Sequence, residues 1–277
     1  MNKIKQNKIT FTFILSAIAI IFTSLTVLSL PVLFNYKSKV TVIEKNFYKN
    51  FKIYLKSQGK ITYKPFPKPH LLVEKASINL NNKKEKDKLI ETSNLKIFIS
   101  LKDIYTRSFN NLNALEITNT NLYFNLSDIK ELRRHLYKKI NKQIIFENCK
   151  IFIKSNKNEV ILISPTKKIL YKINNKTKTK ILNIFGEVFG LNFKSEWKRN
   201  YNYPNLSSHN INIFNPPLEI KNEFEFESSK AFESKSKILF GQESLEYNIQ
   251  YNDNIINVFS PKIEKTNFNI NSKIQLK

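Results

Sequence analysis

Hydrophobic and polar residues follow two different patterns along this chain. Residues 9–34 contain no charged residue, which makes a continuous run of 26 positions. A helix rises 1.5 Å per residue and needs about 20 apolar residues to cross the hydrocarbon layer of a membrane. Beyond residue 60, apolar and polar positions alternate, which is typical of strands with one buried and one wet face. The two patterns predict a membrane helix followed by a mainly β body.

The residues around the apolar run favour a signal-anchor helix. Residues 1–8 carry three lysines and are expected to form a cytoplasmic tail. The alternative is a cleaved signal peptide, for which Ala17 and Ala19 supply a small-x-small site, but strongly apolar sequence continues well beyond it. We therefore expect residues 9–34 to form a transmembrane signal-anchor helix. Lysines also follow the span, so charge does not set its orientation, whereas the layout of short tail, one span and large body favours export.

Residues 35–58 are expected to form an amphipathic helix that continues from the span. Lysines occupy one face, and Gly59 is a suitable end. This helix either caps the body or packs on its core, and the two interpretations are compatible. The apolar positions, three or four residues apart, are Val40, Ile43, Phe47, Phe51 and Tyr54.

Strand-like alternation dominates the rest of the chain and is strictest at residues 95–101 and 223–227. One further helix is predicted over residues 127–141, where Ser127 can act as the N-cap of an apolar stripe. This helix divides the body into a first β unit, residues 59–126, and a second β unit, residues 142–277.

An eight-residue pattern recurs in the body, with apolar residues at positions one, six and eight and Lys or Asn at position three. Odd and even positions of a regular strand point to opposite faces of the sheet. The apolar residue at position one therefore shares a face with those at positions six and eight only if a bulge or tight turn near position three takes up one extra residue. Asn suits that place because it tolerates left-handed backbone. Such recurrence indicates a sheet that grows by addition of similar units. The five copies are residues 73–80, 117–124, 146–153, 213–220 and 263–270.

Composition excludes several functional classes. The formal net charge is +24, but only four basic residues are Arg and the lysines are spread evenly, whereas phosphate-binding surfaces concentrate Arg. We therefore do not expect nucleic-acid binding, although weak attraction to anionic lipid fits this charge. Four glycines leave no Gly-rich phosphate loop, one cysteine excludes disulfide frameworks, and the three histidines lack metal-ligand spacing. No enzymatic activity, cofactor or metal is expected.

The order of these features resembles the N-terminal region of the AsmA family, which includes TamB-type proteins. The resemblance implies a single span in the bacterial inner membrane and a body in the periplasm. It also implies a curved, taco-like antiparallel β-groove with one or two capping helices, which shields phospholipid acyl chains in outer-membrane assembly and lipid homeostasis. The resemblance covers the first half of the body, and the second half shares only the repeat style. The matching segments are residues 34–58, 59–62, 65–69, 71–80, 95–101 and 112–126.

On this interpretation, apolar strand positions line the groove, although the same positions would also suit a closed core. The expected partners are membrane phospholipid and an envelope protein that pairs with the exposed last strand, residues 268–276. Two alternatives stay open: an envelope scaffold without lipid cargo, and an LptC-like single-span component of a transport bridge. The predicted groove-lining residues are Leu95, Ile97, Ile99, Leu122, Phe124, Ile151, Ile153, Phe224 and Phe226.

Overall fold

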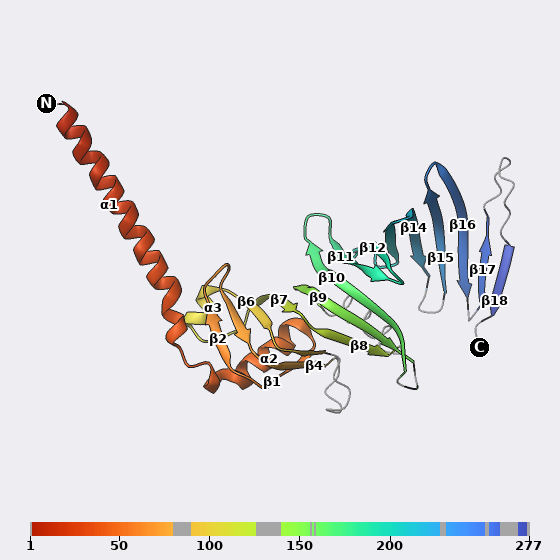
Figure 1. The fold of residues 1–277 in the computed structure, drawn as a ribbon, viewed down its shortest axis with the longest axis horizontal. Coiled ribbons are helices and arrows are strands. Elements are labelled where there is room, and N and C mark those ends of the chain that lie inside the picture. The colour runs from red at the N-terminus through yellow and green to blue at the C-terminus, as the bar shows by residue number, and fades with distance from the viewer. Residues whose placement is uncertain are drawn as a thin grey trace.

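A computed structural model describes residues 2–79, 90–125, 140–155, 157, 159–227, 231–252, 255–260 and 271–275. A long N-terminal helix leads into one open, curved sheet of 18 strands, which extends away from the lower end of that helix (Figure 1). The prediction of a mainly β fold with an apolar helix and a curved antiparallel sheet is confirmed.

The helices lie mostly before the sheet. The segment Phe11–Leu33 is long and apolar enough to cross a membrane. The helices are α1 (Asn2–Ser29), the 3₁₀ turns η1 (Leu30–Leu33) and η2 (Lys37–Lys39), α2 (Val40–Phe51) and the short α3 (Leu101–Tyr105).

The prediction of a helix over residues 35–58 is wrong at its C-terminal end. α2 ends at Phe51, and Lys52 adopts a left-handed conformation with φ of 58°. The chain then enters β1 (Tyr54–Ser57), where Tyr54 pairs with Asn79. Apolar residues a few positions apart fit both the last turn of a helix and the start of a buried strand, so the spacing alone did not locate the change.

The first half of the sheet consists of short strands that join end to end into bent strands. β3 pairs with β2 and β6, while β4 pairs with β1 and β5, so β3 and β4 together cross the sheet once. β7 and β8 repeat this arrangement beside β6 and β5. The strands are β2 (Ile61–Lys64), β3 (His70–Val73), β4 (Ala76–Asn79), β5 (Ile90–Thr92), β6 (Leu95–Ile99), β7 (Leu112–Thr118) and β8 (Asn121–Asn125).

The second half is built mostly from longer strands, and from β10 onward each strand is antiparallel to the one before it. Both β units therefore belong to one continuous sheet. The strands are β9 (Gln143–Lys154), β10 (Val160–Asn174), β11 (Thr179–Val188), β12 (Leu191–Asn200), β13 (Leu206–Phe214), β14 (Pro217–Phe226), β15 (Ala231–Phe240), β16 (Glu243–Asn252), β17 (Ile255–Phe259) and β18 (Asn271–Gln275).

The recurring sequence pattern has a structural counterpart where the two halves join. β9 runs parallel to β7 and β8, with Ile117 opposite Phe146 and Leu122 opposite Ile151. Two copies of the pattern thus lie side by side in register. Their third residues, Asn119 and Asn148, both have positive φ, at 52° and 53°. The prediction of a left-handed Asn at this position is confirmed in these two copies.

The other copies differ in how they use the third residue. In residues 73–80 it falls in the bend between β3 and β4, and in residues 213–220 it falls in the turn between β13 and β14. The copy at residues 263–270 and the helix predicted at 127–141 lie outside the described residues, apart from the last two positions of that helix. Ile140 and Asn141 have no helical assignment.

Candidate functional site

The face of the sheet that carries the hydrophobic core, here called the core face, continues from the first half into the second. One line of directly opposed residues runs along this face from β2 to β16, and all but one of them are apolar. We call this line the apolar row. Its members are Ile61, Val73, Leu95, Ile117, Phe146, Ile169, Ile184, Ser195, Ile211, Ile220, Ile238 and Leu245.

In the first half, the core face is closed. Ile43, Phe47 and Phe51 of α2 belong to the same buried cluster as the strand residues beside them. Because this cluster excludes water, Leu95 and its neighbours have almost no exposed surface. The prediction that they line an open groove is therefore wrong, and they form a packed core. The predicted lining residues corrected in this way are Leu95, Ile97 and Ile99, at 0%, 0% and 3% exposure.

A wholly apolar cavity lies where the two halves meet. Its volume is about 140 Å³, close to that of engineered apolar cavities that stay dry and bind benzene. Three predicted lining residues, Leu122, Phe124 and Ile151, are in its wall. The remaining wall residues are Ile53, Ile78, Ile90, Leu115, Ile117, Ile140, Ile144, Phe146, Ile169, Tyr171, Leu182 and Ile184.

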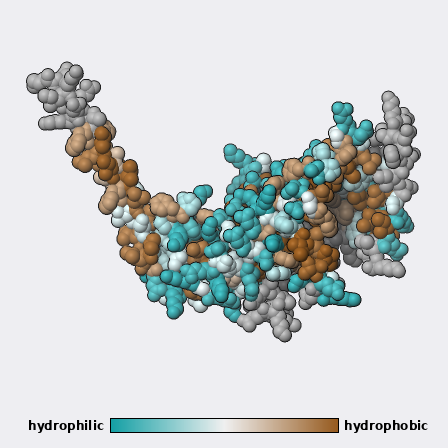
Figure 2. All heavy atoms as spheres, in the orientation of Figure 1, coloured by the Kyte–Doolittle hydropathy of each residue, from teal (hydrophilic) through white to brown (hydrophobic). Residues whose placement is uncertain are grey.

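In the second half, no described element packs over the core face. Ile211, Ile220 and Ile238 of the apolar row are each only partly buried. Figure 2 shows apolar patches among hydrophilic surface in the second half, and a continuous apolar surface along α1. Of the predicted lining residues, Ile153 lies on this face, opposite Phe124 and Leu162, and is half-buried. The second half therefore presents an apolar surface that the first half keeps covered.

Aromatic side chains cover one edge of the uncovered surface. Phe224, predicted from sequence, stacks on Trp197 with ring centroids 5.4 Å apart and lies 6.0 Å from Phe226. Phe232 continues the cluster, 5.8 Å from Phe226 and 5.3 Å from Tyr251. Trp197, Phe232 and Tyr251 were not predicted, because only the strand register shows that they share a face with Phe224.

A few polar groups interrupt the apolar surface. His209 lies opposite Trp197, and its Nε2 is 2.8 Å from the hydroxyl of Ser195. Burial lowers the pKa of His209, so the neutral ring is favoured at this site. Among the described residues, the buried Trp197 Nε1 and Ser207 Oγ have no hydrogen-bond partner. Asn222 and Ser236 continue the polar line opposite His209, and the hydroxyls of Ser236 and Ser234 are hydrogen-bonded at 3.0 Å. A line of polar side chains thus runs between the apolar row and the aromatic cluster.

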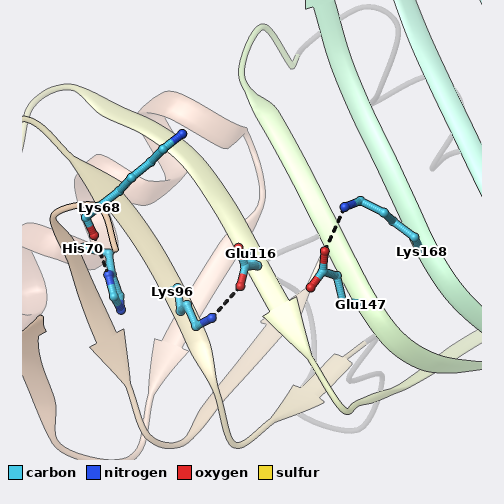
Figure 3. Close-up of polar contacts among 6 residues, drawn as sticks. All are labelled: Lys68, His70, Lys96, Glu116, Glu147 and Lys168. Atoms are coloured by element: carbon cyan, nitrogen blue, oxygen red, sulfur yellow. Dashed lines mark hydrogen bonds and ion pairs between the residues drawn. The ribbon is translucent and has the colours of Figure 1, made fainter. Parts of the chain in front are cut away.

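The opposite face of the sheet carries charge. Lys96 of β6 pairs with Glu116 of β7 at 2.5 Å, and Lys168 of β10 pairs with Glu147 of β9 at 2.9 Å (Figure 3). His70 donates from Nδ1 to the Lys68 carbonyl at 2.8 Å, a local structural contact (Figure 3). The opposite face thus carries ion pairs at the junction of the two halves, although it also holds apolar side chains such as Ile163 and Phe214.

Groups suited to catalysis do not cluster in the part of the chain that the structure describes. No three His, Cys, Asp or Glu side chains come together there in a way that could hold a metal ion. Cys149 is buried, and burial raises the pKa of its thiol, which disfavours the reactive thiolate. The uncovered apolar surface is the feature best suited to binding.

No protein-family model matches this sequence, and neither does any curated protein.

Proposed function

We propose that this chain is a non-enzymatic, AsmA-like protein of the bacterial envelope. α1 anchors it as a single-pass protein of the inner membrane, and its body stands in the periplasm. There the uncovered half of the core face binds acyl chains of phospholipid, in support of outer-membrane assembly and lipid homeostasis. The observation that carries this proposal is the apolar row, which runs from a closed core onto an uncovered surface.

The size of this surface suits hydrocarbon chains. Strands lie about 4.8 Å apart, so the core face spans about 30 Å from β11 to β17. That length equals the thickness of a bilayer's hydrocarbon core, which holds two layers of acyl chains. Large exposed apolar patches are uncommon on soluble proteins and mark interaction sites. An acyl chain would remove the apolar row and the aromatic cluster from water without needing polar partners.

Lipid analysis of the purified full chain tests the proposal. We expect phospholipid to co-purify with the wild type and to fall about tenfold in the Phe224→Glu/Phe226→Glu variant, since charge on this surface opposes apolar contact. Lys194→Glu is the matched control, because it lowers the net charge by the same two units. Lys194 lies on the opposite face of the sheet, between Phe185 and Asn212 of the neighbouring strands. Equal lipid in the double variant, or equal loss in the control, would contradict the proposal.

A reporter fused after Lys277 that is active only in the periplasm tests the orientation.

A second candidate function is an envelope scaffold that binds a partner protein through β18. Among the described strands, β18 pairs only with β17, and Ile274 is 48% exposed. An unpaired strand edge is a template for strand addition. A photo-crosslinker at Ile274 should then capture a defined protein in cells, and the capture should persist in the Phe224→Glu/Phe226→Glu variant. Loss of capture in that variant would mean that partner binding at β18 depends on the lipid-binding surface, which would contradict a scaffold role without lipid.

A further inference from the structure

One end of the sheet is attached to the base of α1. β2 contacts η1, the last four residues of the apolar span. The Tyr105 hydroxyl at the end of α3 donates to the carbonyl of Val27 within the span. The Tyr36 hydroxyl donates to the carbonyl of Pro31 at 2.8 Å, and Phe34 packs edge-on against Tyr105 with ring centroids 5.9 Å apart. α3 and β2 therefore have a fixed height relative to the helix (Figure 1).

This height corresponds to the membrane surface. Val27 precedes the end of the span at Leu33 by six residues, which is about 9 Å along a helix. The Tyr105 ring packs against Phe34, just beyond the span, while its hydroxyl reaches back to Val27, so Tyr105 lies across the end of the span, where tyrosine is enriched in membrane proteins. Arg107, placed 4.7 Å over the Phe34 ring, follows α3 at the same end of the sheet.

The loop between β2 and β3 lies at this end as well. The Ile99 N–H, next to the start of α3, donates to the Pro69 carbonyl at 3.4 Å, so the loop and α3 are neighbours. The loop exposes Phe66 at 58% of its surface, although Phe66 is flanked by buried strands. The hydrogen bond of His70 to Lys68 shapes the same loop (Figure 3).

Charge at this end of the sheet has one sign. The exposed charged residues of segments 64–70 and 99–111 are all basic. The one carboxylate there, Asp103, is buried and accepts hydrogen bonds from Ser100 and Ser108. Its burial acts to raise its pKa, but these hydrogen bonds outweigh that effect and lower it. The exposed cations are Lys64, Lys68, Lys102 and Arg107.

We propose that this end of the sheet is a second membrane contact, inserted in the head-group layer of the leaflet where α1 ends. Phe66 and Tyr105 enter the interface, and Lys64, Lys68, Lys102 and Arg107 face anionic phospholipid head groups. The inference rests on the proposed anchoring of α1. It fixes how the body stands on the membrane, because a helix alone would leave the body free to tilt about one point.

Tryptophan fluorescence in proteoliposomes tests this contact. Trp197 is the one tryptophan of the chain, so each probe is placed in a Trp197→Phe background. Phe66→Trp reports the proposed contact. Phe189→Trp is the control, because Phe189 is 85% exposed in the β11–β12 turn. Phe22→Trp reports insertion of α1 itself, since Phe22 lies within the apolar span.

In vesicles of phosphatidylethanolamine and phosphatidylglycerol with brominated acyl chains, we expect the Phe66→Trp variant to show blue-shifted emission and quenching by shallow bromines. The Phe189→Trp variant should show neither. The shift should weaken in phosphatidylcholine vesicles, and in a Lys64→Gln/Lys68→Gln/Lys102→Gln background. If Phe66→Trp behaves like Phe189→Trp while Phe22→Trp is quenched, this inference is wrong and the anchoring stands. If Phe22→Trp is not quenched, the proposed anchoring fails with it.

Discussion

The two halves of the sheet carry the same apolar row and use it differently. Leu95 in the first half is fully buried, whereas Ile238, in line with it in the second half, is only partly buried. The residues are chemically alike, and both strands carry lysine on the other face. The difference arises from what packs above them, because α2 covers the first half and no described element covers the second. Alternation along a strand thus specifies an apolar face, but not what packs against that face.

Removing a large core side chain should separate the halves most clearly. Phe47→Ala should lower the free energy of unfolding by about 3–5 kcal/mol, because Phe47 of α2 is fully buried. Phe232→Ala, in the uncovered half, should lower the free energy of unfolding by about 1 kcal/mol, because a partly exposed side chain buries less apolar surface when the chain folds. Chemical denaturation of the detergent-solubilised chain measures both. Equal costs would mean that the second half is covered in solution.

The bend at the boundary between the halves gives a smaller effect. Asn119→Val and Asn148→Val should each cost about 1–2 kcal/mol, because a β-branched residue is strained at positive φ. Both asparagine side chains are exposed, so lost packing is not the cause. Asn113→Val is the matched control, since residue 113 is exposed in β7 with an ordinary φ, and Asn148→Gly should be tolerated. Thermal denaturation separates these variants, and similar costs at all three asparagines would contradict a conformational role.

The smallest predicted effect concerns pH and belongs to the uncovered half. Burial lowers the pKa of His209 in the folded protein, so the unfolded state binds a proton first as pH falls below about 6.5. The contribution of His209 to stability is therefore complete above that pH and is lost as pH falls through the folded pKa. Denaturation between about pH 7 and pH 5 should show this slope in the wild type and a reduced slope in His209→Gln. An unchanged slope would assign it to other groups.

Sequence patterns predicted the strands and the fold class well, because alternation reports local side-chain direction. They also located the left-handed residues Asn119 and Asn148, because the parity of the repeat requires an extra residue there. They did not predict where α2 ends, nor that Leu95 is enclosed, because the covering element comes from a distant part of the chain. For the same reason Trp197 was missed, since its partnership with Phe224 depends on register across three strands.

The parallel pairing of β9 with β7 and β8 also determines the order in which the sheet can assemble. From β9 onward, each strand docks on the strand made just before it, so its contacts are local in sequence. Before that, β9 must return across an intervening stretch of chain to align beside β7 and β8, and the first half likewise pairs strands that are not consecutive, β1 with β4, β3 with β6 and β5 with β8. Closing such loops carries an entropic cost that hairpins avoid. We therefore expect the strands up to β9 to assemble more slowly than the hairpins that follow them, each of which adds to the strand just before it.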